Sequence, residues 1–240
     1  MENTFADQLP LIIQSFEQQG LVTRTFRRLD IARQLVIIDA IMEESSLHGP
    51  AEMNIKKVAA RADVSIGSLY QYFHNKEGLL NFAIQLTVQQ TVAAFNTFLP
   101  YLDQLSFQEA YSIYINSGLE WGKEQQQFVR FFAKAAYQEH PELEDSVVTP
   151  ISNCMLQLVR VMVQKGQESG EVRADVDTEA VSRILHALSI ALGDPILLPY
   201  LNKYFQVNDE SVPMTQIFSS LMDLLERGMI KPKENTERHP

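Results

Sequence analysis

Residues Asn54 to Leu80, NIKKVAARADVSIGSLYQYFHNKEGLL, are the most informative part of the chain. It reads as two short helices joined by a tight turn at Asp63-Val64, with a third helix starting after them. Ser65 follows the turn, where its hydroxyl can cap the second helix. The outer face of that helix is polar and carries glycine near its amino end. These features are typical of a helix that enters the major groove of DNA.

Helical spacing of apolar residues recurs along the rest of the chain, whereas no stretch alternates as a strand would. The sequence therefore predicts an all-α fold. Asn75, the Ser106 to Glu109 capping box and Asp177 are all predicted to start helices. Outside the opening stretch, we expect helices over 29–47, 75–98, 106–123, 150–168, 177–193 and 213–229, with an aromatic-rich segment at 127–138.

The chain has a net charge of -10, which opposes binding to DNA phosphates if it is spread evenly. It is not spread evenly: residues 24–80 hold eight lysines and arginines against seven acids, while residues 81–240 hold twelve against twenty. An acidic remainder restrains non-specific binding to nucleic acid, and a local basic rim can still contact phosphates.

Several other classes of protein are disfavoured. The most apolar stretch, 185–201, is interrupted by His186 and by Gly193-Asp194-Pro195, so we expect no membrane span. The N-terminus lacks the pattern of a secretory signal, which favours a cytoplasmic protein. Cys154 is the only cysteine and we expect it to pack in the core. No metal-binding, phosphate-loop or nucleophile motif is present, so we predict no cofactor, no metal, no catalytic residue and no enzyme.

The string from Val58 to Phe73, continued by Lys76 and Leu79-Leu80, resembles the signature of the tetracycline-repressor (TetR) family. The resemblance covers residues 29–80. It implies an N-terminal three-helix helix-turn-helix DNA-binding head and a larger C-terminal helical domain that binds a ligand and dimerises. It also implies a homodimer on a pseudo-palindromic operator, because two-fold symmetry doubles the contacts of one short helix.

Carried over residue by residue, the resemblance implies a set of DNA-binding positions. Tyr70 has two readings, since its ring can reach the DNA backbone or pack beside Leu69. Ile66 departs from the usual polar residue and could read only a thymine methyl group or pack on a sugar. Ser45 and Pro50 also depart from the pattern and question the packing of the first head helix. The implied DNA-binding residues are Lys56, Ser65, Ile66, Gly67, Ser68, Tyr70, Gln71, Tyr72 and Lys76.

The predicted effector pocket is apolar and aromatic, so a small hydrophobic or aromatic effector fits better than a sugar or nucleotide. Taken singly, each residue is better explained by core packing, and His186 by a satisfied interface histidine. The candidates are Phe95, Phe98, Tyr111, Tyr114, Trp121, Phe128, Phe131, Phe132, Met155, Met162 and His186. A DNA-binding regulator without a small-molecule effector, controlled by a protein partner, is the alternative.

The last two long helices present apolar faces that could close a monomeric core, but an intersubunit four-helix bundle fits better. The predicted dimer interface comprises Leu185, Leu188, Leu192, Phe218, Leu221 and Leu225. We therefore expect an N-terminal extension at 1–23, a DNA-binding head at 24–80, an effector and dimerisation domain at 81–229, and a polar tail at 230–240. Phe5, Leu9, Ile12 and Phe16 predict a short extra helix in the extension, docked on the C-terminal body.

Overall fold

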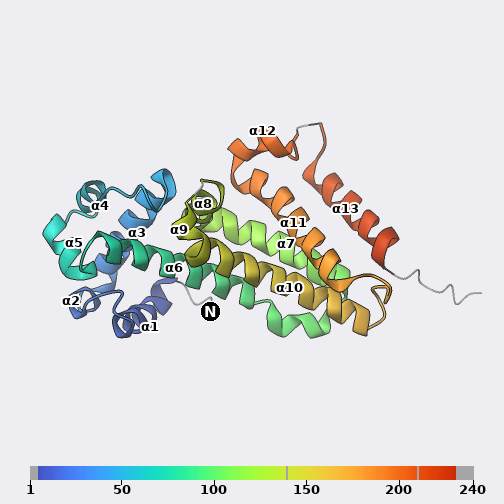
Figure 1. Ribbon diagram of the computed structural model, residues 1–240, viewed down its shortest axis with the longest axis horizontal. Coiled ribbons are helices and arrows are strands. Elements are labelled where there is room, and N and C mark those ends of the chain that lie inside the picture. Colours follow the sequence, from blue (N-terminus) through green and yellow to red (C-terminus); the bar gives the residue numbers. More distant parts are fainter. Residues whose placement is uncertain (1–4, 139, 210, 231–240) are drawn as a thin grey trace, which may run out of the picture. The chain divides into compact units, whose positions relative to one another are not determined.

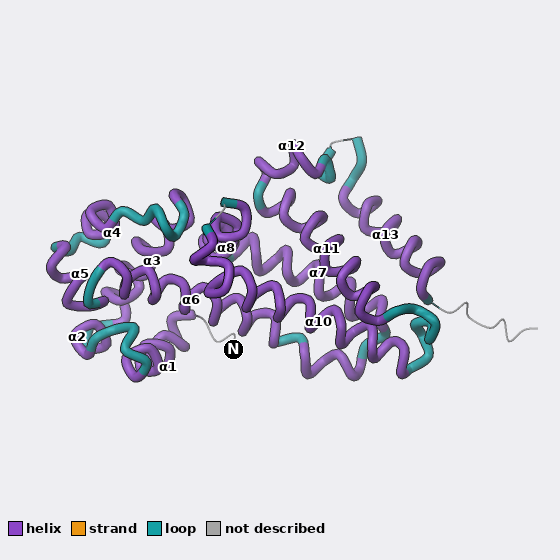
Figure 2. The backbone as a smooth tube through the Cα atoms, viewed as in Figure 1, coloured by secondary structure: helices purple, strands orange, loops and turns teal. Residues whose placement is uncertain are grey.

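The computed structural model describes residues 5–138, 140–209 and 211–230. Within these ranges, Figure 2 shows helices and loops without a strand, apart from isolated bridges between Val172 and Ile230 and between Asp209 and Val212. The predicted all-α fold is confirmed. The predicted tail lies, apart from Ile230, outside the described residues.

The chain divides into two compact units, each with its own packing. The first unit contains residues 1–92 and 125–151, and the second contains residues 93–124 and 152–240. The units are defined by which residues pack together, and residues 125–151 pack with the N-terminal segment. The functional boundaries expected at residues 23, 80 and 229 stay a prediction.

Figure 1 labels the helices of the first unit, and several of them begin at a side-chain cap. Asp30, Asn54 and Ser65 each accept a bond from a backbone N–H in the first turn of the helix that follows. Gly49, with φ of 96°, ends the long helix that Asp30 begins. The elements are α1 (Phe5–Gln18), α2 (Arg24–Arg27), α3 (Ile31–His48), α4 (Ile55–Arg61), α5 (Ile66–Phe73), the greater part of α6 (Lys76–Asn96), α8 (Gln126–Tyr137), α9 (Pro141–Leu143) and the π-helical turn η2 (Glu144–Val148).

The N-terminal extension folds as the helix α1. Leu9, Ile12 and Phe16 are buried on one face of it, and Phe16 meets Phe82 edge-on with ring centroids 5.6 Å apart. The helix contacts α2 and α3, which belong to the predicted DNA-binding segment. The predicted extra helix is therefore present, and it packs on the predicted DNA-binding segment and on Phe82, the second residue of the predicted C-terminal domain. Its docking on the rest of that domain stays a prediction. The apolar spacing could show that a face is buried but not which partner covers it.

Helix α8 packs against α3 within the first unit. Phe128 and Phe131 are buried, and the Gln127 side chain donates a hydrogen bond of 2.8 Å to Asp39 on α3. The aromatic segment predicted for the effector domain thus supports the head helix α3.

The second unit contains the end of α6, η1 (Leu99–Gln104), α7 (Phe107–Glu124), most of α10 (Thr149–Glu168), α11 (Thr178–Leu197), η3 (Pro199–Leu201), α12 (Asn202–Phe205) and α13 (Met214–Met229). The predicted capping box is present, since Ser106 N donates to Glu109 Oε2 at 2.9 Å and Glu109 N donates to Ser106 Oγ at 3.3 Å. Glu171 adds a second cap by accepting from Phe107 N at 2.6 Å.

Helix α11 runs further than the sequence predicts, because Pro195 lies inside it and the helix ends only at Leu197. A proline near a helix end removes one backbone donor and need not stop the last turn. Leu198 N closes that turn on Asp194 O at 2.7 Å.

Two helical stretches, Pro141–Glu168 and Thr178–Leu197, are long and apolar enough to cross a membrane by length and composition. The sequence predicts no stretch that could span a membrane. Core helices of soluble proteins pass the same test, and α10 places Leu158, Val159 and Met162 in the core of the second unit.

Candidate nucleic-acid interface

The turn between α4 and α5 is fixed by local backbone geometry. Asp63 adopts a positive φ of 50°, and its carbonyl oxygen accepts a 2.6 Å hydrogen bond from Arg33 Nη2 on α3. Ser65 Oγ then accepts from Ser68 N at 2.9 Å, which confirms the predicted cap of the second helix. The two helices α4 and α5 are in contact, as a helix-turn-helix requires.

Helix α5 has a buried side and an open side. Leu69 and Phe73 are fully buried, whereas Gly67 and Gln71 are exposed. Tyr70 is 41% exposed, so part of its ring is open to solvent, and both predicted roles, contact with the DNA backbone and partial packing beside Leu69, stay predictions. The remaining candidates of α5, Ile66, Ser68 and Tyr72, are half-buried, and the cap Ser65 is exposed. The open side therefore offers an amide, a phenol and a glycine together, which suits contact with base edges and phosphates.

The carboxyl end of α5 is held by several bonds. His74 turns the chain with φ of 68°, and Asn75 N donates to Phe73 O at 2.8 Å. Asn75 Oδ1 accepts from Gly78 N at 2.8 Å, which confirms the predicted cap of α6. Thr23, at the start of α2, donates from its backbone N to Tyr72 O at 2.9 Å and from its hydroxyl to Gln71 O at 2.7 Å.

The basic residues of the head fall into two groups. One group is engaged inside the unit: Arg27 pairs with Glu17, Arg61 with Glu43 at 3.1 Å, and Lys57 lies 3.9 Å from the buried Glu44. The other group is exposed and has no ion pair in the part of the chain that the structure describes. This second group comprises Arg24, Arg28, Lys56 and Lys76.

The departures in the first head helix are accommodated by packing. Ser45 is fully buried, and its hydroxyl donates to Ile41 O at 2.7 Å and lies 3.3 Å from Met53 Sδ. Met53 is buried as well and occupies space that a larger side chain at position 45 would need. The packing of α3 is therefore intact. Helix α3 can thus support α5, the helix predicted to contact base edges, which we call the reading helix.

The predicted effector residues are divided between the two units. Tyr111, Tyr114 and Met162 lie in the core of the second unit, and Phe95 packs against that core with its ring centroid 5.9 Å from that of Tyr114. Phe98, Trp121, Met155 and His186 are half-buried residues of the same unit. Phe128 and Phe132 lie on α8 in the first unit. Core packing accounts for the first group, as expected of each residue taken singly.

Two polar atoms in the second unit are buried without a hydrogen-bonding partner among the described residues: the Tyr114 hydroxyl and Nδ1 of His186. Ser189 lies beside Tyr114: its hydroxyl donates to His186 O at 2.7 Å, and its oxygen can still accept a hydrogen bond from the Tyr114 hydroxyl. Burial raises the pKa of Tyr114 well above its usual range. Burial, with a smaller contribution from Arg183, lowers the pKa of His186, so the ring is neutral at pH 7.

Helices α11 and α13 flank an apolar groove with a volume of about 310 Å³. Its lining residues are Leu188, Leu192, Val212, Gln216, Ile217, Ser220, Leu221 and Leu224. Three of the six residues predicted for the dimer interface line this groove. Leu185 is instead 1% exposed, and its carbonyl accepts from Tyr111 at 3.0 Å, so it belongs to the core of the unit. Ile184 on α11 and Leu224 on α13 are more than half exposed, so these two residues, and not Leu185, lie on the solvent-exposed face of the two helices.

Sequence reasoning did not single out Thr23 or Phe26. Phe26 is fully buried, with its ring centroid 4.9 Å from that of Phe73 and 5.7 Å from that of Tyr72. Both residues stand next to arginines, and their partners lie nearly fifty residues further along the chain, so no local pattern reveals these contacts. No group of metal-binding side chains occurs among the described residues.

Residues 37–82 match the family model for "Bacterial regulatory proteins, tetR family". No curated protein matches the chain. A TetR family transcriptional regulator from Chloroflexus aurantiacus is 20% identical, with a TM-score of 0.65 over 88% of this chain and 99% of that one. The matches indicate DNA-binding regulators and no enzyme family.

Two further similar structures hold ligands of different chemistry. The regulator FadR from Bacillus subtilis, in complex with stearoyl-CoA, is 19% identical, with a TM-score of 0.60 over 80% of this chain and 96% of that one. A transcriptional regulator from Saccharomonospora viridis, in complex with choline, is 17% identical, with a TM-score of 0.62 over 84% of this chain and 98% of that one. At these identities the likeness establishes the fold.

Proposed function

Since the chain belongs to the tetR family of bacterial regulatory proteins through its helix-turn-helix head, we propose that it is a cytoplasmic transcriptional repressor. It binds a pseudo-palindromic operator as a homodimer and is released by a small hydrophobic or aromatic effector. The observation that carries the DNA-binding part is the open side of α5, with Gln71 and Tyr70 exposed above a buried Leu69 and Phe73.

On DNA, α5 lies in the major groove and reads base edges with Gln71 and its neighbours. The exposed Lys56 and Lys76, at the amino ends of α4 and α6, bind phosphates, as do the exposed Arg24 and Arg28 of the basic segment 24–33. Gly67 at the amino end of α5 lets the backbone come close to the DNA. The acidic charge of residues 81–240 limits binding to other sequences.

The dimer forms through the open faces of α11 and α13. The groove between these helices is apolar, and Ile184 and Leu224 are exposed beside it. A second copy of the same pair of helices would cover these leucines and complete a four-helix bundle. Two copies present two reading helices, which a palindromic operator requires.

The effector binds in the second unit. Its apolar part packs near the aromatic and methionine side chains around Phe95, and its polar group pairs with the buried Tyr114 hydroxyl or Nδ1 of His186. Because both atoms belong to neutral groups, an uncharged polar group suits them better than an ionised one. The complexes with stearoyl-CoA and choline show only that regulators of similar fold take small ligands.

Repression follows when the bound dimer excludes polymerase from the promoter. The effector favours a conformation in which the two reading helices have the wrong separation, and it must bind that conformation more tightly by about 1–3 kcal/mol to release DNA. Helix α6, which starts beside the reading helix at Lys76 and ends at Asn96 in the second unit, is the element that carries the change.

The first test is binding to the intergenic DNA beside the protein's own gene, with scrambled duplex as control and salt varied. We expect tight, sequence-dependent binding by the wild type. Gln71→Ala should lose base preference while retaining phosphate contacts. Lys76→Ala should weaken binding to every sequence and reduce the salt slope by about one.

Equal binding of the wild type to operator and scrambled duplex would contradict specific DNA recognition at this promoter. A duplex selected from a random pool by the wild type then decides whether the protein reads another sequence. If operator binding is established but a library of apolar small molecules releases no DNA, control by a protein partner becomes the better explanation. The tight packing of Tyr111 and Met162 in the core is the observation that favours that alternative.

A further inference from the structure

The segment that precedes the three-helix head is bound to the reading helix itself. Among the last four residues of α5, the carbonyl groups cannot find partners within the helix. Thr23 donates a hydrogen bond to two of these carbonyl groups. Its backbone N donates to Tyr72 O at 2.9 Å, and its hydroxyl donates to Gln71 O at 2.7 Å. Asn75 N takes a third, Phe73 O, at 2.8 Å.

The same threonine also starts α2. Its hydroxyl oxygen accepts from Phe26 N at 3.4 Å while its proton goes to Gln71 O. One hydroxyl therefore joins the first turn of α2 to the last turn of α5. Because it acts as donor and acceptor at once, a side chain of equal size without the hydroxyl loses both bonds.

An apolar contact strengthens this tie. Phe26 is fully buried between the rings of Tyr72, Phe73 and Phe82, at centroid distances of 5.7, 4.9 and 6.0 Å. Tyr72 is one of the candidate DNA contacts, and its ring is half-buried against Phe26. The ring's direction is thus set by α2 and not by α5 alone.

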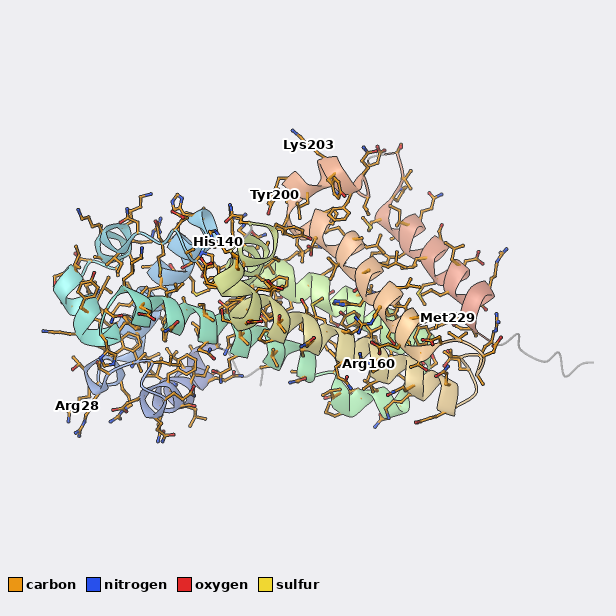
Figure 3. The ribbon with its side chains drawn as sticks, viewed as in Figure 1. Arg28, His140, Arg160, Tyr200, Lys203 and Met229 are labelled. Carbon is orange, nitrogen blue, oxygen red and sulfur yellow. The ribbon has the colours of Figure 1, made fainter. Side chains whose placement is uncertain are left out.

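Behind α2, helix α1 closes the arrangement. Leu21 N and Val22 N both donate to Phe16 O, at 2.9 and 3.4 Å, and Val22 is buried. Arg27 pairs with Glu17 across the same junction. The two residues before Thr23 are therefore fixed to the end of α1, while Thr23 itself is bonded to α5. Arg28 projects from the end of α2 into solvent (Figure 3).

We propose that Thr23 is a positioning residue for DNA recognition, and that α1 and α2 fix the carboxyl end of the reading helix through it. Thr23 contacts no base. It holds Gln71 and Tyr72 by their backbone oxygens so that their side chains meet the base edges in one orientation. This inference rests on the proposed DNA-binding function and adds residues outside the helix-turn-helix to the machinery of specificity.

The test compares Thr23→Val with wild type on two DNA duplexes: one selected from a random pool by the wild-type protein, and its scrambled counterpart. Valine keeps the branched shape and the backbone N–H bond but removes the hydroxyl. We expect affinity for the selected duplex to fall roughly three- to tenfold, the size of one hydrogen bond. Affinity for scrambled duplex and the salt slope should stay as in wild type, because no phosphate contact changes.

Matched variants separate positioning from general damage. Thr23→Ser keeps the hydroxyl and should retain wild-type discrimination. Thr25→Val, an exposed position of the same helix, should also behave as wild type. Arg24→Gln with Arg28→Gln should weaken both duplexes alike and lower the salt slope, a pattern that Thr23→Val must not show. If Thr23→Val does not unfold cooperatively, Thr23→Cys serves in its place, since its thiol is only a weak donor.

A second readout is amide hydrogen exchange in the free protein. The bond to Gln71 O belongs to the last turn of α5, so Thr23→Val should speed exchange at residues 72–75 and leave α4 unchanged. Unchanged discrimination and unchanged exchange in Thr23→Val would overturn the inference while the DNA-binding function stands. Failure of the wild type to select any duplex would instead overturn the proposed function itself.

Discussion

Two glycines, Gly67 in the first turn of the reading helix and Gly78 in the first turn of α6, have opposite steric surroundings. A Cβ atom on Gly78 would lie 2.0 Å from the carbonyl oxygen of Phe73, the last residue of α5. A Cβ atom on Gly67 would meet only Ser65 Oγ, at 3.6 Å, which is an ordinary contact. Gly78 is therefore required by the fold, whereas Gly67 is free to change as far as the fold is concerned.

We predict that Gly78→Ala lowers the free energy of unfolding by about 2 kcal/mol or more, because a backbone carbonyl must move to relieve the clash. Gly67→Ala should raise it by about 0.5–1 kcal/mol, the usual gain for alanine over glycine within a helix. Gly67→Ala should nevertheless bind operator more weakly, since its methyl group stands where the helix approaches DNA. Denaturant unfolding and operator binding check both variants, and a Gly78→Ala protein as stable as wild type would contradict the steric argument.

At the same scale, the caps were predictable and the distant contacts were not. Ser65, Asn75 and the Ser106 to Glu109 pair bond within a few residues of themselves, so composition and spacing reveal them. Thr23 bonds to a residue 48 positions away, and Glu171 caps a helix that starts 64 positions before it. Nothing in a local pattern encodes such a partner.

At the scale of elements, the 3.6-residue period located the long helices, because each buries one continuous stripe. It could not assign the face of α11 correctly. Leu185 is buried in the core, where its backbone carbonyl accepts a hydrogen bond from the Tyr111 hydroxyl, and the neighbouring Ile184 is exposed, although both are apolar. It also could not show that α8 packs on α3, because the aromatic run has the same spacing whichever helix it covers.

The open face of α11 and α13 gives a prediction about assembly. Leu224 is 68% exposed on α13, and Leu11 is 72% exposed on α1, so the two are matched in type and exposure. Leu224→Glu should weaken dimerisation by roughly tenfold or more, because it would place a charge in an apolar interface. Leu11→Glu should leave the dimer intact. Analytical ultracentrifugation over a range of concentrations measures both.

A wild-type protein that sediments as a monomer at about micromolar concentration would contradict the dimer. A dimer that both substitutions leave unchanged would place the interface elsewhere.

At the scale of the whole molecule, stability should depend on pH in the range where histidine titrates. Burial lowers the pKa of His186 in the folded chain below the usual value of 6.5. The unfolded chain therefore binds a proton at a higher pH than the folded one does. It follows that stability is complete above pH 6.5 and is lost as pH falls through 6.5 toward the lowered value.

We predict that His186→Gln removes this part of the pH dependence, so the free energy of unfolding of the wild type minus that of the variant is larger at about pH 8 than at about pH 5. Glu109, Asp175 and Glu179 do not obscure the effect. Their hydrogen bonds, to Ser106, Arg173 and Arg160 respectively, lower their pKa values, so their contribution is lost only at a more acidic pH. Parallel curves for wild type and variant across this range would show that His186 is not buried in its neutral form.

The contacts of Thr23 have a consequence for how this regulator can diverge. Its partners on the reading helix are main-chain oxygens, which every amino acid supplies. Gln71 can therefore be exchanged for a residue with another base preference without loss of the tie that holds the helix in place. Mutation can change the operator sequence that is recognised while the support remains the same, so duplicated copies of such a gene could acquire new targets by few substitutions.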